Sequence, residues 1–276
     1  MLKSLLRLIP RRFRSHRPLI HVVRLHGAIG VGSPLKPALT YQGVEQTLQR
    51  AFAAKGIAGV ALSINSPGGS AVQSAMIHDL IRGLAARHKL TVYVFCEDVA
   101  ASGGYWLACA GDEIYADPSS IVGSIGVISA GFGFVEALAK LGIERRVHTA
   151  GENKSILDPF QPERAEDVAR LLALQGEVHD AFKALVRARR GAKLQDDPDL
   201  FTGAFWSGTR AQALGLIDGI GHLRAVMERK FGDKVELKVI EKPQGWGLKR
   251  LGFGAELAAS SLDVLEARAL WARFGL

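Results

Sequence analysis

Short apolar runs of strand length alternate with longer amphipathic segments through the first half of this 276-residue chain. The runs IAGVALSIN (57–65) and LTVYVFC (90–96) contain few polar residues, which is typical of buried strands. Between them, AVQSAMIHDLIRGLAARH (71–88) repeats apolar residues at the three- and four-residue spacing of a helix. This alternation predicts parallel strands joined by helical crossovers, and therefore an α/β fold.

The remaining elements follow from the same patterns. We expect further strands or extended segments at 18–30, 112–117, 119–129, 143–151 and 234–241. We expect further helices at 43–56, 134–142 and 162–190, and a last helix after the glycine-rich turn 201–221. The economical division is a basic N-terminal arm (1–19), one α/β domain (20–243) and a C-terminal tail (244–276).

The positive charge is concentrated near the N-terminus. Residues 1–44 contain eight Lys or Arg and no acid, so the net charge of +8 leaves the rest of the chain balanced. A nucleic-acid-binding face in the domain is therefore not expected. The arm mixes Leu and Ile with Arg and Lys, which suits either a solvated arm or contact with an anionic membrane surface. No apolar run reaches the roughly 20 residues of a membrane span. We therefore expect a cytoplasmic protein, and we expect any peripheral contact with the inner face of the membrane to be made by residues 1–19.

The two cysteines do not indicate a metal site. Cys96 and Cys109 stand in apolar surroundings without metal-ligand spacing, so we expect buried free thiols. No Walker A, G-x-G-x-x-G, HExxH or G-x-S-x-G motif is present. We expect neither a metal ion nor a cofactor.

Two glycine pairs carry the strongest indication of chemistry. SPGG (66–69) and ASGG (101–104) each follow a buried strand, and the second contains Ser102. On neighbouring parallel strands these turns are expected side by side at the strands' carboxyl ends, where α/β sites lie. Their N–H groups could then stabilise one oxyanion. Alternatively, each pair serves only as a turn and close-packing device.

A serine nucleophile needs a base, because its hydroxyl is barely ionised at neutral pH. His148 lies on the expected strand 143–151, but no carboxylate is placed to orient it, and a structural role suits it better. Lys154 lies in the loop TAGENKSILDPF (149–160), beside apolar residues that could desolvate its amine and lower its pKa. Most loop lysines are solvated, so this placement alone is weak support.

Four motifs together resemble the signal peptide peptidase A (protease IV) family of Ser–Lys peptidases. They are SPGGS, AASGGYW, GSIGV and GENKSILDPF, in the family's order, and the resemblance runs from about residue 21 to 232. The resemblance implies a ClpP/crotonase-like superhelix of β-β-α units with parallel sheets. It implies the following roles: Ser102 as nucleophile, Lys154 as general base, Ser124 as the residue orienting the lysine, and the Gly69 and Gly103 N–H groups as oxyanion hole.

The resemblance also implies an activity and an assembly. The family cleaves hydrophobic peptides, such as signal peptide remnants, through an acyl-enzyme, and forms homo-oligomers with active sites near subunit interfaces. We expect this chain to depart from the pattern in three respects: one catalytic repeat, no N-terminal membrane anchor and a tail without a counterpart. Two alternatives stay open: a crotonase-type acyl-CoA enzyme using Glu97 or Asp98, and a non-catalytic scaffold of the same fold that binds membrane proteins.

Overall fold

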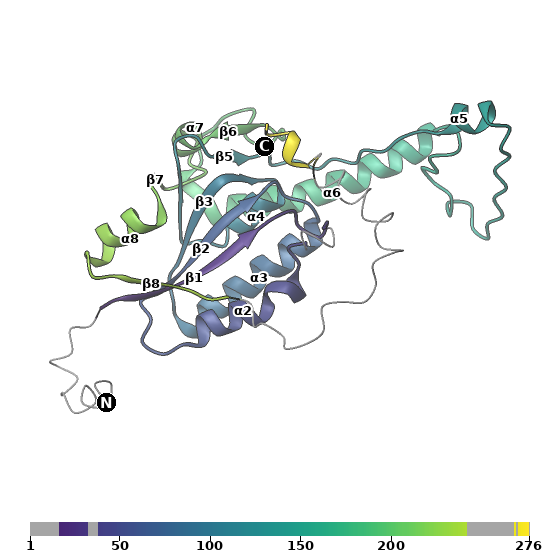
Figure 1. Cartoon of the computed structure of the whole chain (residues 1–276). Coiled ribbons are helices and arrows are strands. Elements are labelled where there is room, and N and C mark those ends of the chain that lie inside the picture. The colour runs from purple at the N-terminus through teal and green to yellow at the C-terminus, as the bar shows by residue number, and fades with distance from the viewer. Residues whose placement is uncertain (1–16, 33–37, 242–267, 269, 276) are drawn as a thin grey trace.

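The computed structural model describes residues 17–32, 38–241, 268 and 270–275, which build a sheet of eight strands with helices on both faces (Figure 1). The strands are β1 (Leu19–His26), β2 (Gly59–Ser66), β3 (Val92–Ala101), β4 (Glu113–Ala116), β5 (Ile121–Gly123), β6 (Phe205–Ser207), β7 (Gly219–Ile220) and β8 (Glu236–Val239). The helices are α2 (Tyr41–Ala53), α3 (Ala71–His88), α4 (Gly103–Ala108), α5 (Val135–Lys140), α6 (Ala165–Arg190), α7 (Gly208–Ala213) and α8 (Leu223–Phe231), with a 3₁₀ turn at Gly191–Lys193.

The sheet is almost entirely parallel. Its main path runs β6-β5-β3-β2-β1-β8, while β4 pairs with the first part of β3 and with β7. Only the β5–β6 pairing is antiparallel among the described strands. The long strand β3 therefore has β4 and then β5 on the same side, and the predicted α/β class is confirmed.

Alternate residues of the central strands enter two different cores. Val23 and Leu25 of β1 pack into the cluster formed with α2, α3 and α4. Ile20 and Val22 of the same strand join the smaller cluster beneath α8. Burial on both faces explains why the central strands read as nearly continuous apolar runs in the sequence.

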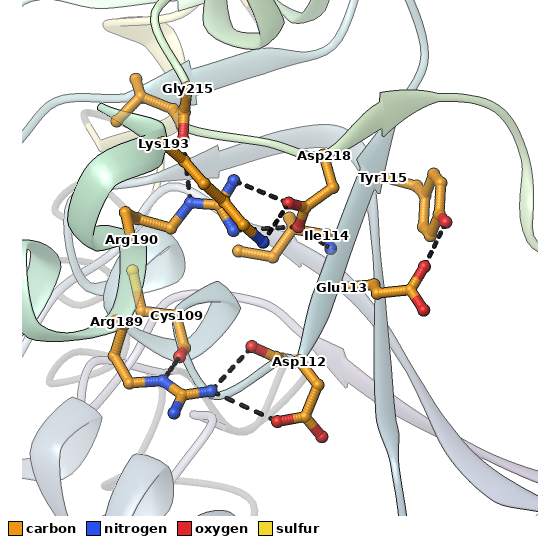
Figure 2. Close-up of polar contacts among 12 residues, drawn as sticks. Cys109, Asp112, Glu113, Ile114, Tyr115, Arg189, Arg190, Lys193, Gly215 and Asp218 are labelled. Atoms are coloured by element: carbon orange, nitrogen blue, oxygen red, sulfur yellow. Dashed lines mark hydrogen bonds and ion pairs between the residues drawn. The ribbon is translucent and has the colours of Figure 1, made fainter. Parts of the chain in front are cut away.

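The C-terminal end of α6 is fixed to this domain by buried polar contacts (Figure 2). The Arg190 guanidinium donates to both carboxylate oxygens of Asp218, at 2.9 and 3.1 Å, and to the Gly215 carbonyl. Lys193 contacts the same carboxylate at 2.6 Å. Burial of Asp218 opposes ionisation, but the hydrogen bonds from Arg190 and Lys193 outweigh it and lower the pKa of this carboxyl. Trp106 of α4 stacks on Phe182 of α6, with ring centroids 4.7 Å apart.

The other end of α6 leaves the domain. Residues 127–181, here called the projection, comprise α5, the loops on either side of it and most of α6, and Asp167 is their one buried residue. Figure 1 shows α5 and the adjoining loops at the far end of α6 from the sheet. The projection has its own contacts: Phe134 stacks on Phe160 at 5.4 Å, and Arg145 pairs with Asp158 at 2.8 Å.

The prediction of a strand at 143–151 is wrong. These residues form no strand, and nearly all of them, His148 included, are exposed on the projection. A strand requires a neighbour for its backbone hydrogen bonds, and this segment lies away from the sheet. The sequence also failed to indicate β6, α7 and β7 within the segment read as a glycine-rich turn.

The expected terminal segments lie mostly outside the described residues, so the three-part division stays a prediction. Residues 1–16 and 242–267 are not described. Within the expected tail, Phe274 is described and packs against Val99 and Ala101 of β3. Cys96 and Cys109 are buried free thiols, as predicted.

Candidate active site

Ser102 stands where β3 ends and α4 begins, in a strained backbone conformation. Its φ and ψ are 53° and −123°, a region that residues with side chains rarely occupy. Its N–H donates to the Gly123 carbonyl at 2.8 Å, and its carbonyl accepts from Trp106 at 3.0 Å. The half-buried serine is thus held in a sharp strand-to-helix turn, a geometry that suits presentation of a hydroxyl.

The SPGG turn lies directly against this serine. A Cβ added to Gly68 would stand 2.7 Å from the Ser102 Cβ and 2.8 Å from the Gly103 nitrogen. Gly68 has a φ of 100°, so the position excludes a side chain for two reasons. The prediction that the two glycine turns lie side by side is therefore confirmed.

Gly69 is held by hydrogen bonds of its neighbours. Ile29 donates to the Gly68 carbonyl and accepts from Ser70, both at 2.8 Å. A Cβ on Gly69 would come within 2.1 Å of the Ile29 oxygen. Among the described residues, neither the Gly69 N–H nor the Gly103 N–H has a hydrogen-bond acceptor. Within the described part of the chain, both donors are therefore available to bind an oxyanion.

Ser124 lies beside Ser102 at the same edge of the sheet. The last residue pair of β3 and β5 is Ala101–Gly123, and Ser102 and Ser124 each follow by one residue. Ser124 is buried and also has a positive φ, 54°, while its N–H donates to the Ala204 carbonyl at 2.7 Å. The structure thus brings together Ser102, Ser124, Gly69 and Gly103.

Lys154 is not part of this group within one chain. It is exposed in the loop between α5 and α6, and its backbone N–H donates to the Gly151 carbonyl at 3.3 Å. No hydrogen bond among the described residues joins its amine to Ser102 or Ser124. His148, the other candidate base, is also on the projection. A single chain therefore presents a serine and possible oxyanion donors, with the candidate base held away from them.

Sequence reasoning missed two polar side chains that contact the segments next to Ser124 and Ser102. His179 of α6 hydrogen-bonds the Ile125 carbonyl at 3.0 Å, next to Ser124. Asn65 of β2 contacts Asp98 and Val99 of β3. The asparagine just before SPGG was the available signal, but its contacts depend on a strand register that the sequence does not reveal.

Two models of known protein families match this chain. The model of peptidase family S49 matches residues 85–237, more than half of the chain, and the Clp protease model matches residues 24–122. The chain belongs to peptidase family S49, a family of serine peptidases, and has the ClpP/crotonase-like fold. The resemblance drawn from the four motifs is confirmed.

Curated relatives of this chain include longer proteins. Proteins of Brucella abortus and Brucella melitensis, each named Na(+)/H(+) antiporter NhaA, are 55% identical over 284 residues, covering 98% of this chain and 39% of the relative. The chloroplastic serine protease SPPA of Arabidopsis thaliana is 28% identical over 242 residues, covering 82% of this chain and 35% of the relative. The chain thus spans about two fifths of the Brucella relatives. In the described part of the chain, no helix has the length and apolar character needed to cross a membrane.

Proposed function

We propose that this chain is a serine endopeptidase in which Ser102 attacks the peptide carbonyl and Lys154 acts as general base. The strained turn at Ser102, packed against Gly68, is the observation that carries this proposal. The hydroxyl transfers its proton to the neutral amine as the serine oxygen bonds to the carbonyl carbon. The amine then gives this proton to the leaving nitrogen, and water hydrolyses the acyl-enzyme.

The oxyanion of this reaction would be bound by the Gly69 and Gly103 N–H groups. A Cβ on Gly69 would collide with the Ile29 carbonyl, a Cβ on Gly103 would stand 2.5 Å from the Ser74 Oγ, and neither N–H has another acceptor among the described residues. Preorganised backbone donors of this kind stabilise the charge that develops in acyl transfer. Ser124, one residue beyond β5, would accept or donate a hydrogen bond to hold the lysine amine in place.

Lys154 would come from a second copy of the chain. The projection holds it away from the Ser102 of its own chain and exposes large apolar side chains, among them Phe132 (82% exposed) and Leu141 (71%). Several large apolar side chains exposed on one segment are consistent with a contact surface for another protein chain. Burial against a neighbouring copy would also remove water from the amine and favour its neutral form. We therefore propose a homo-oligomer with the dyad completed across subunits.

The substrates that suit this site are hydrophobic peptides, including signal peptide remnants, and the expected location is the cytoplasm. The name of the Arabidopsis relative, a serine protease, agrees with the reaction but identifies no substrate. Contact of residues 1–19 with an anionic membrane would bring the enzyme to such peptides. Sedimentation of the full chain with phosphatidylglycerol vesicles, compared with neutral vesicles, tests that contact.

The test of the reaction is a serine-directed fluorophosphonate probe combined with peptide cleavage. We expect the probe to label Ser102, located by mass spectrometry, and Ser102→Ala to abolish both labelling and cleavage. Lys154→Ala should also abolish cleavage, whereas Lys140→Ala, which removes another exposed lysine of the projection, should leave it unchanged. Cleavage by Ser102→Ala at the wild-type rate would refute the proposal.

A further inference from the structure

Strand β3 contains a bulge shortly before Ser102. Its pairing with β2 runs through Ile64–Cys96 and resumes at Ser66–Ala100. The single β2 residue Asn65 therefore stands opposite three β3 residues, 97–99. Bulges change the direction of a strand and occur next to active sites, where they set the direction of a side chain.

The Asn65 side chain takes the place of the missing backbone ladder. Its Nδ2 donates to Asp98 Oδ2 at 2.7 Å, and its Oδ1 accepts the Val99 N–H at 3.3 Å. Its own carbonyl accepts the Gly27 N–H at 2.9 Å, which ties the same point to the loop after β1. One amide thus satisfies both a donor and an acceptor of the bulge.

The residues beside the bulge are held as well. Ser63 of β2 donates to Glu97, and His26 of β1 is hydrogen-bonded to the Ser63 hydroxyl at 2.8 Å. On the other side, Ser120 donates to the Cys96 carbonyl at 3.3 Å. Of these contacts, the hydrogen bond from Val99 to the Asn65 amide is the nearest to Ser102 in sequence, because Val99 precedes Ser102 by three residues.

We propose that Asn65 is a positioning residue for the peptidase reaction. By fixing the conformation of the bulge, it determines the position of Ser102 at the end of β3. The inference rests on the proposed function. Ser102 has little room for displacement, because Gly68 packs on one side and its N–H is bonded to Gly123 on the other. A shift of roughly 1 Å in a reacting group can cost about a hundredfold in rate.

The chemistry of the Asn65–Asp98 contact provides a selective test. Asn65→Asp keeps the shape and the oxygen that accepts from Val99, but places a second carboxylate against Asp98. Two carboxylates at this distance repel, and one then takes up a proton more readily than an isolated carboxyl. Adding Asp98→Asn exchanges the two groups of the native pair. The amide is then at position 98 and donates to the carboxylate at position 65, which restores one amide–carboxylate hydrogen bond.

The experiment measures fluorophosphonate labelling of Ser102, together with kcat and KM for a hydrophobic peptide, in the full chain from pH 5 to pH 8. We expect Asn65→Asp to label at least about tenfold more slowly than wild type at pH 8, with the loss mainly in kcat. Relative to wild type, its rate should rise towards pH 5, as one carboxyl protonates. Asn65→Asp combined with Asp98→Asn should recover most of the rate at pH 8.

Gln49→Glu is the matched control. Gln49 donates its side-chain amide to Glu45 at 3.3 Å on the exposed face of α2, so this change creates a comparable carboxylate pair away from Ser102. We expect it to leave labelling unchanged. If Asn65→Asp folds and labels like wild type, or if the reversed pair folds but labels no faster than Asn65→Asp, the positioning role is wrong. A wild-type chain unlabelled at Ser102 would overturn the proposed function itself, and the inference with it.

Discussion

At the scale of single residues, we expect the site to depend on the close packing of Gly68 against Ser102. Gly68→Ala would place a methyl carbon 2.7 Å from the Ser102 Cβ, so that the serine turn or the SPGG turn must move. We expect at least a tenfold loss of fluorophosphonate labelling at Ser102, because misplacement of a reacting group by roughly 1 Å has effects of this size. Labelling rates of the folded variant measure this directly.

Gly56→Ala separates the steric contact from backbone strain. Gly56 also has a positive φ, 77°, but an added Cβ meets no atom within 4 Å. Its replacement should lower stability by about 1 kcal/mol through strain alone and leave labelling intact. Equal labelling by Gly68→Ala and Gly56→Ala would show that the close approach at Ser102 is unimportant.

The two cysteines give a second prediction at this scale. Burial raises the pKa of both the Cys96 and Cys109 thiols to about 12. The thiolate is the reactive form, so neither should react with iodoacetamide at pH 8 in the folded protein. Both should react after unfolding in guanidinium chloride. Rapid alkylation of the native chain would contradict their burial, and mass spectrometry distinguishes these outcomes.

At the scale of secondary-structure elements, the anchoring of α6 depends on the Arg190–Asp218 pair. Asp218→Asn leaves a buried guanidinium, 2% exposed, facing a neutral amide, and should cost about 3 kcal/mol of unfolding free energy at pH 7. The pKa of Asp218 is lowered by folding, so the stability it adds is present above its unfolded pKa and is lost as pH falls through its folded value. The difference from wild type should therefore shrink below about pH 4.

An exposed pair supplies the control for this measurement. Arg224 and Glu228 lie one turn apart on α8, 3.3 Å from each other, and both are solvent-exposed. Glu228→Gln should change the unfolding free energy by less than about 0.5 kcal/mol. Denaturant unfolding at pH 7 and at pH 3.5 compares the two variants. A loss in Asp218→Asn that is equally large at both pH values would contradict the linkage.

The sequence predicted those elements whose signal is local. Strands β1, β2 and β3 and helices α2, α3 and α6 are long enough for apolar periodicity to identify them, and the glycine pairs identified the turns at Gly68 and Ser102. The segment 143–151 has a strand-like composition, but a strand also needs a partner, which no local pattern supplies. The bulge opposite Asn65 was not predicted for a similar reason, because the pairing register depends on both strands and not on the sequence of either one alone.

At the scale of the whole molecule, we propose that the projection of one copy completes the site of another. Phe132 and Leu141 are exposed on it, and we propose that a second copy covers them. Phe132→Asp with Leu141→Glu should shift the protein towards monomer in sedimentation velocity and lower peptide cleavage in parallel. Stability of the isolated chain should change little, since both side chains already face solvent.

Gln161→Glu is the corresponding control, since it places a charge at an exposed polar position of the same projection. It should leave both assembly and cleavage near wild type. If the doubly substituted projection remained as associated and as active as wild type, the exposed apolar side chains would not be the contact between copies. Sedimentation and cleavage measured on the same samples show whether the two properties change together.

The most direct test mixes two inactive variants. Ser102→Ala and Lys154→Ala should each be inactive alone, and each lacks a different half of the dyad. If Lys154 of one copy serves Ser102 of its neighbour, random mixing at equal amounts restores about a quarter of the wild-type rate, because half of the serines and half of the facing lysines are intact. Co-refolded mixtures that stay inactive, although they assemble as wild type does, would contradict a dyad shared between copies.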